Sequence, residues 1–152
     1  MKRRNIVGVA AIAASALALG GWVSADRAAM AEEEAAVRAT LEHYLQGHAT
    51  GDGSHMRIAF HPEAKLFAVR EGKFWQLTSE EYISRSPGKP AADEAERRRS
   101  IESVEVTGNA AVAKVVLDYP AVRFTDYMSL LKIDGEWRIV NKTFYAEPKA
   151  KQ

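Results

Sequence analysis

The chain has 152 residues, enough for one domain of usual size and too few for two. Hydrophobic residues make up 47% of the chain and charged residues 27%, a globular composition that excludes an intrinsically disordered protein. With no cysteine, the chain cannot form a disulfide, a thiolate nucleophile or a cysteine-based metal site.

The first 25 residues have the layout of a secretory signal peptide. MKRRN is short and basic, residues 6–23 carry no charge, and small residues end the segment at Ala25. We expect cleavage after Ala25, a periplasmic or secreted protein, and no stable membrane association afterwards. The alternative is an uncleaved membrane anchor, because the apolar run is nearly long enough to span a bilayer. Cleavage leaves 18 of the 21 basic residues against 20 acidic ones, a net charge of −2, and we expect no nucleic-acid partner.

Residues 26–31 are expected to be a linker to one domain at residues 32–147, followed by a tail at 148–152. The domain begins with a predicted amphipathic helix at residues 32–50, whose glutamates at 32–34 suit the positive end of the helix dipole. The apolar spacing places one buried stripe on this helix: Val37, Leu41, Tyr44, Leu45 and His48.

A second, short helix is predicted at residues 53–60, with Asp52 as its cap and Met56 and Phe60 facing inward. His61-Pro62 ends it, because the residue before a proline is pushed out of the helical region. The Gly-Ser-His-Met stretch at residues 53–56 therefore belongs to the domain and is not the remnant of a tag.

The pattern then changes to strands. Residues 64–70 and 73–77 flank a Glu71-Gly72 turn, and a short helix follows at about 78–85. A loop rich in proline and charge precedes strands at about residues 97–107, 110–119, 122–133 and 136–145. The order of elements predicts an α+β fold with helices on one face of a curved sheet.

The last hairpin turns at Asp134-Gly135, and its register decides which side chains face inward. A two-residue turn would put Trp137 opposite Lys132 and mix apolar with charged side chains. We therefore predict a three-residue turn ending at Gly135. This register gives an inner face that changes from apolar to polar: Thr125, Tyr127, Ser129, Leu131 and Ile133 with Trp137, Ile139, Asn141 and Thr143. Such a face indicates a pocket: the apolar part forms a core that closes one end, and the polar part lines the remaining wall.

Three stretches resemble the nuclear transport factor 2-like superfamily: YLQGHATGD at residues 44–52, FHPEA at 60–64 and DGEWRIVNK at 134–142. GHATGD, FHPEA and FTDYMSLLKIDGEWRIVNK are most similar to the bacterial subfamily named "putative lumazine-binding". The resemblance covers nearly all of residues 32–147. It implies a cone-shaped, strongly curved mixed or antiparallel sheet wrapped around a long N-terminal helix, with two short helices. This fold hosts enzymes of several kinds and many non-enzymes.

The superfamily includes ketosteroid isomerase, which needs a helix tyrosine, an aspartate base and a second, protonated aspartate. The resemblance places Tyr44 at the tyrosine, Ala68 at the base and Ser129 at or near the second aspartate. An alanine cannot abstract a proton, so the isomerase chemistry is not implied.

Eight residues are predicted to bind a ligand in the pocket: Tyr44, His48, His61, Trp75, Tyr82, Tyr127, Ser129 and Asn141. For the tyrosines, Ser129 and Asn141 the alternative is a buried polar network, and Trp75 and Tyr82 can equally be core aromatic residues. For His48 the alternative is a core histidine, and for His61 it is a hydrogen bond to the last helix carbonyls. The histidines lack metal-ligand spacing, with His43 and His55 expected to be exposed, so we expect neither a metal nor a cofactor.

The leading hypothesis is an exported, non-enzymatic protein whose pocket binds a small aromatic or heterocyclic molecule. A homodimer is expected through the outer sheet face at Met128, Leu130, Val140 and Phe144. Two alternatives remain open. One is an isomerase, cyclase or hydratase with His48 or His61 as base and Tyr44 or Tyr127 as acid. The other is a dimeric scaffold whose pocket is filled by its own side chains.

Overall fold

The computed structural model describes residues 15–150, and their side chains from residue 26 onward. It forms two units, Met1–Glu32 and Glu33–Gln152, and the second contains the sheet. Within the described residues, no helix combines the length and the apolar character needed to cross a membrane. Residues 1–14 of the predicted signal peptide lie outside the described residues, and its cleavage stays a prediction.

Helix α1 (Ser15–Thr50) begins before the predicted residue 32 and includes residues 26–31, which were expected to be a linker. Three of these six residues are alanine, the strongest helix former, and arginine and methionine also favour a helix. The helix ends at Thr50 as predicted. Gly51 follows with a φ of +71°, and its N–H donates to the Gly47 carbonyl at 3.0 Å. A Cβ at Gly51 would also collide with the Lys89 carbonyl, so this helix end requires glycine.

Two short helices follow, and both begin at a cap. Helix α2 (Gly53–Ala59) starts at Asp52, whose carboxylate accepts the Ser54 N–H at 2.8 Å as predicted. Helix α3 (Ser79–Ile83) starts with a capping box between Thr78 and Glu81. The predicted loop before the third strand also contains a single 3-10 turn, η1 (Glu94–Glu96).

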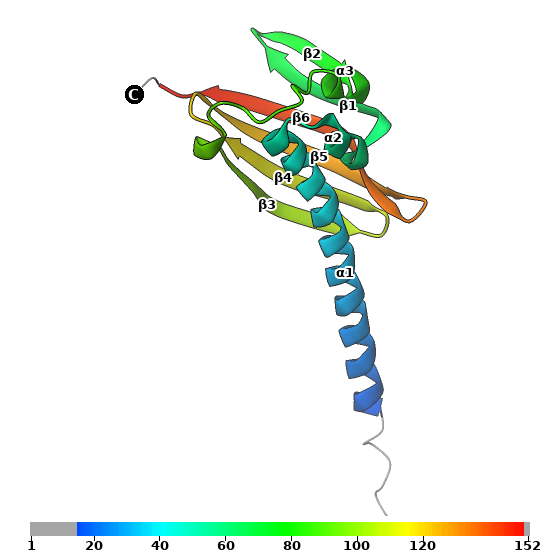
Figure 1. Ribbon diagram of the computed structural model, residues 1–152. Helices are drawn as coiled ribbons and strands as arrows, with labels where there is room; N and C mark the ends of the chain where they lie inside the picture. Colours follow the sequence, from blue (N-terminus) through cyan, green and yellow to red (C-terminus); the bar gives the residue numbers. More distant parts are fainter. Residues whose placement is uncertain (1–14, 151–152) are drawn as a thin grey trace, which may run out of the picture. The chain divides into compact units, whose positions relative to one another are not determined.

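The sheet of the second unit has six strands in the order β2-β1-β6-β5-β4-β3. All neighbours are antiparallel except β1 and β6, which run parallel. This confirms the predicted α+β class with a curved, mixed sheet, which is not closed into a barrel. Figure 1 shows the end of α1 and helix α2 lying over one face of the sheet. The strands are β1 (Phe60–Arg70), β2 (Lys73–Thr78), β3 (Arg98–Thr107), β4 (Ala110–Asp118), β5 (Val122–Ile133) and β6 (Glu136–Pro148).

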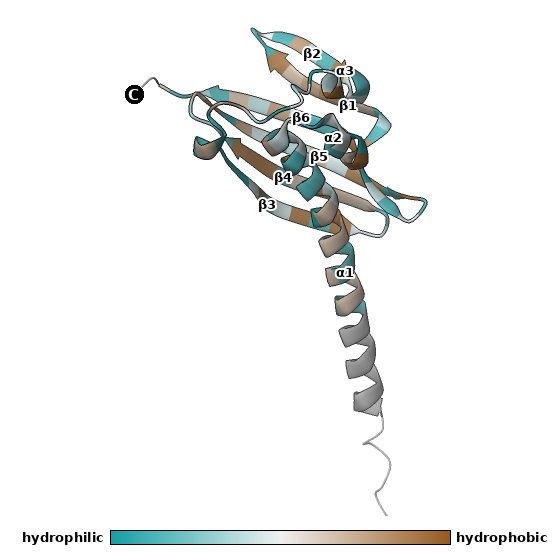
Figure 2. Cartoon of the chain, in the orientation of Figure 1, coloured by the Kyte–Doolittle hydropathy of each residue, from teal (hydrophilic) through white to brown (hydrophobic). Residues whose placement is uncertain are grey.

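The core lies between the buried stripe of α1 and the concave face of the sheet. Val37, Leu41 and Tyr44 are fully buried, as the helical spacing predicted. They pack in one cluster with Val115 and Leu117, which belong to the hydrophobic run of β4 visible in Figure 2. Each such side chain contributes about 1.5–3 kcal/mol by leaving water, so this contact holds the helix on the sheet.

The predicted register of the β5–β6 hairpin is wrong. Lys132 pairs with Trp137 and Ile133 with Glu136, so Asp134 and Gly135 form a two-residue turn, both with positive φ. This turn matches the right-handed twist of the strands. Lys132 is tolerated beside Trp137 because the Glu33 carboxylate accepts from Lys132 Nζ at 2.5 Å and from Trp137 Nε1 at 2.9 Å.

A β-bulge then reverses the faces of β6. Ser129 pairs with Asn141 but Leu130 pairs with Ile139, which leaves Val140 as an extra residue. Trp137 and Ile139 face inward as predicted, whereas beyond the bulge the inward side chains are Lys142 and Phe144. On β5 the buried side chains are Asp126, Met128 and Leu130.

The outer face of the sheet therefore differs from the predicted one. Met128 and Leu130, expected at a dimer interface, are only 2% and 1% exposed in the core, and Phe144 lines the inner pocket. Tyr127 and Leu131 are exposed instead. The homodimer itself stays a prediction.

Candidate functional site

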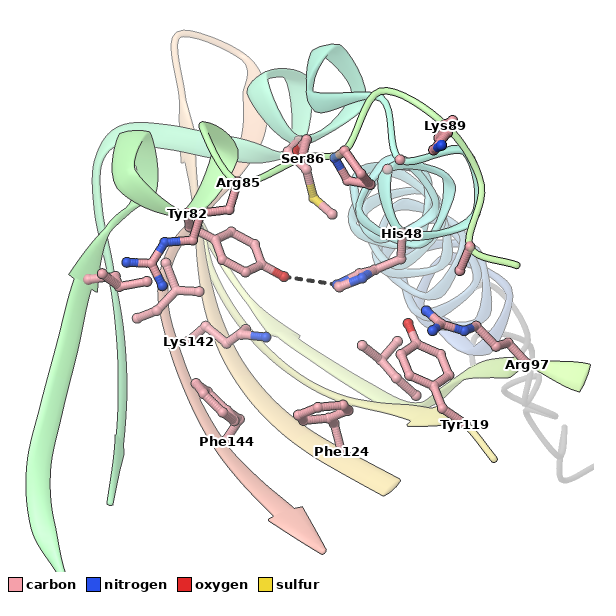
Figure 3. Close-up of a pocket in the computed structure, with 18 of the residues that line it drawn as sticks. His48, Tyr82, Arg85, Ser86, Lys89, Arg97, Tyr119, Phe124, Lys142 and Phe144 are labelled. Carbon is pink, nitrogen blue, oxygen red and sulfur yellow. Dashed lines mark hydrogen bonds between the residues drawn. The ribbon is translucent and has the colours of Figure 1, made fainter. Parts of the chain in front are cut away.

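A pocket of about 320 Å³ opens on the concave side of the sheet within the second unit. Helix α1 contributes His48 to its wall, and helix α3 contributes Tyr82. The floor is aromatic, with Phe124 from β5 and Phe144 from β6 (Figure 3). A volume of this size suits a small organic ligand.

Lys142 is a buried cation on the pocket wall. Its side chain is 5% exposed, and Figure 3 shows it directed toward the centre of the pocket. Lys142 Nζ donates to Tyr44 Oη at 2.8 Å and to Asp126 Oδ2 at 3.1 Å. Tyr44 in turn donates its hydroxyl hydrogen to Asp126 Oδ2 at 2.5 Å. The three side chains form a hydrogen-bonded triad with only the lysine reaching the pocket.

Burial changes the acid–base behaviour of this triad. Loss of water lowers the pKa of Lys142, and the nearby Asp126 carboxylate opposes that change. Burial, followed by the charge of Asp126, raises the pKa of Tyr44 well above its ordinary value. Tyr44 is therefore a neutral donor that holds Asp126 in place. Asp126 Oδ1 is buried without a hydrogen-bond partner among the described residues.

His48 and Tyr82 form a second polar pair, 2.9 Å apart between His48 Nε2 and Tyr82 Oη (Figure 3). Burial lowers the pKa of His48 well below 6.5, helped by the positive charges of Lys142 and Arg99. His48 is thus a neutral imidazole at physiological pH, and burial also raises the pKa of the Tyr82 hydroxyl. In the tautomer that leaves Nε2 unprotonated, His48 accepts from the Tyr82 hydroxyl and can receive a proton.

Cations and aromatic rings pair around the rim. The Arg70 guanidinium lies 4.1 Å from the centre of the Trp75 ring, and that of Arg97 lies 4.2 Å from the centre of the Tyr119 ring. Burial raises the pKa of Tyr119, and its hydroxyl has no hydrogen-bond partner of good geometry among the described residues, although Arg99 lies close by.

The structure brings some of the predicted site residues together. His48, Trp75 and Tyr82 line the pocket, and Tyr44 lies behind Lys142. His61 does not line it. Its Nδ1 accepts from the Glu63 N–H at 3.2 Å, and no hydrogen bond from His61 to the last helix carbonyls is present among the described residues. Whether these residues bind a ligand stays a prediction.

Three predicted site residues lie on the other side of the sheet. Tyr127, Ser129 and Asn141 line a shallow groove on the outer face, because the true register and the bulge reverse their direction. The resemblance to the isomerase predicted Ser129 at or near the position of the second aspartate. In the structure, the side chain that contacts Tyr44 is Asp126. Sequence reasoning missed Asp126, Lys142 and Tyr119. A two-residue Asp-Gly turn would have placed Asp126 on the inner face, whereas Lys142 faces inward only because of the bulge at Val140.

The remaining histidines contact each other. His43 and His55 are half-buried, not fully exposed as expected, and their Nδ1 atoms lie 3.2 Å apart. Among the described residues, no three side chains of His, Asp or Glu converge as metal ligands would.

Comparison with known proteins places the chain in a family. The family model described as "Putative lumazine-binding" matches residues 32–145. The chain belongs to this family. The match covers both polar groups of the pocket, from Tyr44 and His48 to Lys142.

Solved structures of NTF2-like proteins share the fold of this family member. A protein of Shewanella baltica is 28% identical, with a TM-score of 0.71 over 78% of this chain and 97% of that one. A protein of Silicibacter pomeroyi is 27% identical, with a TM-score of 0.68 over 77% of this chain and 98% of that one. These relatives agree with the curved mixed sheet and the long helix.

One similar protein has a named activity. The aldolase FrzH of Cladobotryum sp. is 25% identical over 119 residues, which cover 75% of this chain and 91% of the aldolase. The NTF2-like fold and the family match support a pocket that binds a ligand or acts as an enzyme.

Proposed function

We propose that this protein binds a small aromatic carbonyl compound in the pocket and catalyses proton transfer at the carbon next to the carbonyl group. The observation that carries the proposal is Lys142, a buried amine that reaches the pocket while Asp126 and Tyr44 fix its position. Ordinary structural lysines keep the amine in water, because burying an ammonium group is costly.

Lys142 supplies the group that activates the carbonyl. An ammonium group has three N–H donors, and Tyr44 and Asp126 occupy two of them. The third can donate to the carbonyl oxygen of a ligand. As the neighbouring carbon loses its proton, negative charge develops on this oxygen, and a fixed cation in a water-poor site stabilises it strongly.

The Tyr82–His48 pair accepts the proton. Tyr82 Oη takes the proton from carbon as its own hydrogen passes to His48 Nε2, 2.9 Å away. The electron pair of the broken C–H bond becomes part of the enolate, whose oxygen remains on Lys142. Return of the proton to another position isomerises the substrate, and attack of the enolate on a second carbonyl forms a carbon–carbon bond. The second outcome is an aldol reaction, the activity named for the related protein FrzH.

The proposal is tested by deuterium uptake from D2O into the CH2 group next to the carbonyl of 4-phenyl-2-butanone, followed by NMR. The wild type should accelerate uptake, and Lys142→Met and Tyr82→Phe should remove most of the acceleration. Tyr127→Phe is the matched control, because this tyrosine lies on the outer face. If the ketone binds and its uptake equals that of the protein-free sample, the enzymatic proposal fails.

That outcome would favour a second candidate, the non-enzymatic binding protein. Trp75, Phe124 and Phe144 line the pocket together, and their rings suit a flat aromatic or heterocyclic ligand. Binding without turnover would then be the function.

We also propose that the protein is exported, on the basis of the signal-peptide layout of residues 1–25. Intact mass of the protein recovered from its native cell should correspond to a chain that starts at Asp26. A full-length mass in the membrane fraction would favour the anchor instead.

A further inference from the structure

The charges around the pocket all have one sign. Among the described residues, four cationic side chains line it in addition to Lys142, and no aspartate or glutamate does. The chain as a whole is balanced, with 21 basic and 20 acidic residues, so this is a local arrangement and not a consequence of composition. The four are Arg70, Arg85, Lys89 and Arg97.

Most of this positive charge is uncompensated. Among the described residues, Arg70, Arg85 and Lys89 have no carboxylate partner within 4.0 Å. Arg97 is different, because its Nε donates to Asp93 at 2.8 Å while its guanidinium stacks on Tyr119. Asp93 does not line the pocket, and it contacts the guanidinium at Nε, so it positions Arg97 and leaves the two terminal nitrogens without a carboxylate partner among the described residues.

The cations lie on opposite sides of the opening. In Figure 3, Arg97 and Lys89 lie on the side of His48, and Arg85 lies on the side of Tyr82. The positive charge of the rim also acts on the interior of the pocket. The charge of Arg97 is one of the causes that lower the pKa of His48. A concave surface lined by one sign of charge concentrates ligands of the opposite sign.

We propose that the natural substrate is an aromatic carbonyl compound that also carries a carboxylate, held by Arg97 with its carbonyl oxygen at Lys142. This inference rests on the proposed function and adds the substrate class. A guanidinium binds a carboxylate through two parallel hydrogen bonds, and Arg97 is held in place for this by Asp93 and Tyr119. A neutral ketone would bring no negative charge into this positively lined pocket.

Three probes separate the charge from the carbonyl group: 4-phenyl-2-oxobutanoate, its methyl ester and 4-phenylbutanoate. Titration calorimetry should give about tenfold tighter binding for the two acids than for the ester. Raising sodium chloride from about 20 to about 200 mM should weaken binding of the acids only, because salt screens exposed charges. This salt test uses the wild type, so it does not depend on a variant that folds.

Variants locate the effect. Arg97→Gln should weaken binding of both acids about tenfold and leave the ester unchanged, which is the loss expected for one ion pair in a partly buried site. Arg123→Gln is the matched control, because Arg123 lies outside the pocket and is exposed. Equal binding of acids and ester, without a salt effect, would overturn the inference.

The inference and the proposed function can fail separately. If the acids bind in an Arg97-dependent way but no probe exchanges deuterium, the anion site stands and the enzymatic proposal fails. If the ester exchanges deuterium as well as the keto acid and binds equally well, the enzymatic proposal stands and the anion site is overturned.

Discussion

The buried pair of Asp126 and Lys142 makes a prediction about stability that does not depend on the ligand. Their side chains are 0% and 5% exposed, and Nζ lies 3.1 Å from Oδ2. Each charge compensates the other, and both side chains are almost completely buried. We therefore consider three variants: Asp126→Asn, Lys142→Met and the double variant.

Removal of one partner leaves the other buried charge without compensation, which costs about 3–5 kcal/mol in other proteins. Tyr44 remains as a hydrogen-bond partner in both cases, so we expect each single variant to lower the free energy of unfolding by about 3 kcal/mol. The double variant has no charge to leave unpaired. The free energy of unfolding that the double variant loses should be smaller than the sum of the losses of the two single variants by about 2–3 kcal/mol. This is the size of the coupling between residues in direct contact.

Urea denaturation followed by circular dichroism at neutral pH gives the three free energies of unfolding. A matched surface cycle, Asp118→Asn with Arg123→Gln, provides the control because this pair lies 3.9 Å apart and is partly exposed. Its coupling should be below about 1 kcal/mol. Single losses at Asp126 and Lys142 that add within about 0.5 kcal/mol would refute the view that the pair is mutually compensating.

Three further predictions follow from the same contacts. Tyr44→Phe should lower the free energy of unfolding by about 1.5–3 kcal/mol in urea denaturation, because it removes a hydrogen-bond partner of both Asp126 and Lys142. The depressed pKa of His48 means that the unfolded chain binds a proton below pH 6.5 while the folded chain stays neutral. The free energy of unfolding should therefore fall as pH drops below 6.5, by up to about 1.4 kcal/mol per unit, and His48→Asn should reduce this slope; equal slopes would contradict the argument. If the protein dimerises through the outer face, Tyr127→Asp should give a monomer in light scattering and leave the unfolding free energy of the monomer unchanged, whereas an unchanged dimer would place the interface elsewhere.

The sequence was sufficient for the elements that depend on local chemistry. The Asp52 cap, the Glu71-Gly72 turn and the buried stripe of α1 follow from residue type and spacing over a few positions. His48 was placed in the pocket by the same spacing, since it continues the stripe beyond the hydrophobic core.

The polar centre of the site could not be found in this way. Separation of apolar from charged side chains favoured the wrong hairpin register, because Asp126 and Lys142 were assumed to face water. Their burial depends on mutual compensation between two strands, which hydrophobic patterning does not record. The bulge at Val140 also has no sequence signal of the kind that a glycine turn provides. A preference for the common two-residue Asp-Gly turn would have recovered the β5 half of the site.

The central claim is that Lys142 donates a hydrogen bond to the carbonyl oxygen of a bound ligand. The most direct measurement is the carbon-13 chemical shift of the carbonyl of 4-phenyl-2-butanone, labelled at that carbon and bound to the protein. A hydrogen bond from a cation polarises the carbonyl, so the bound signal should move downfield in the wild type and return toward the free value in Lys142→Met. The same carbonyl shift for the ketone bound to both proteins would contradict the account.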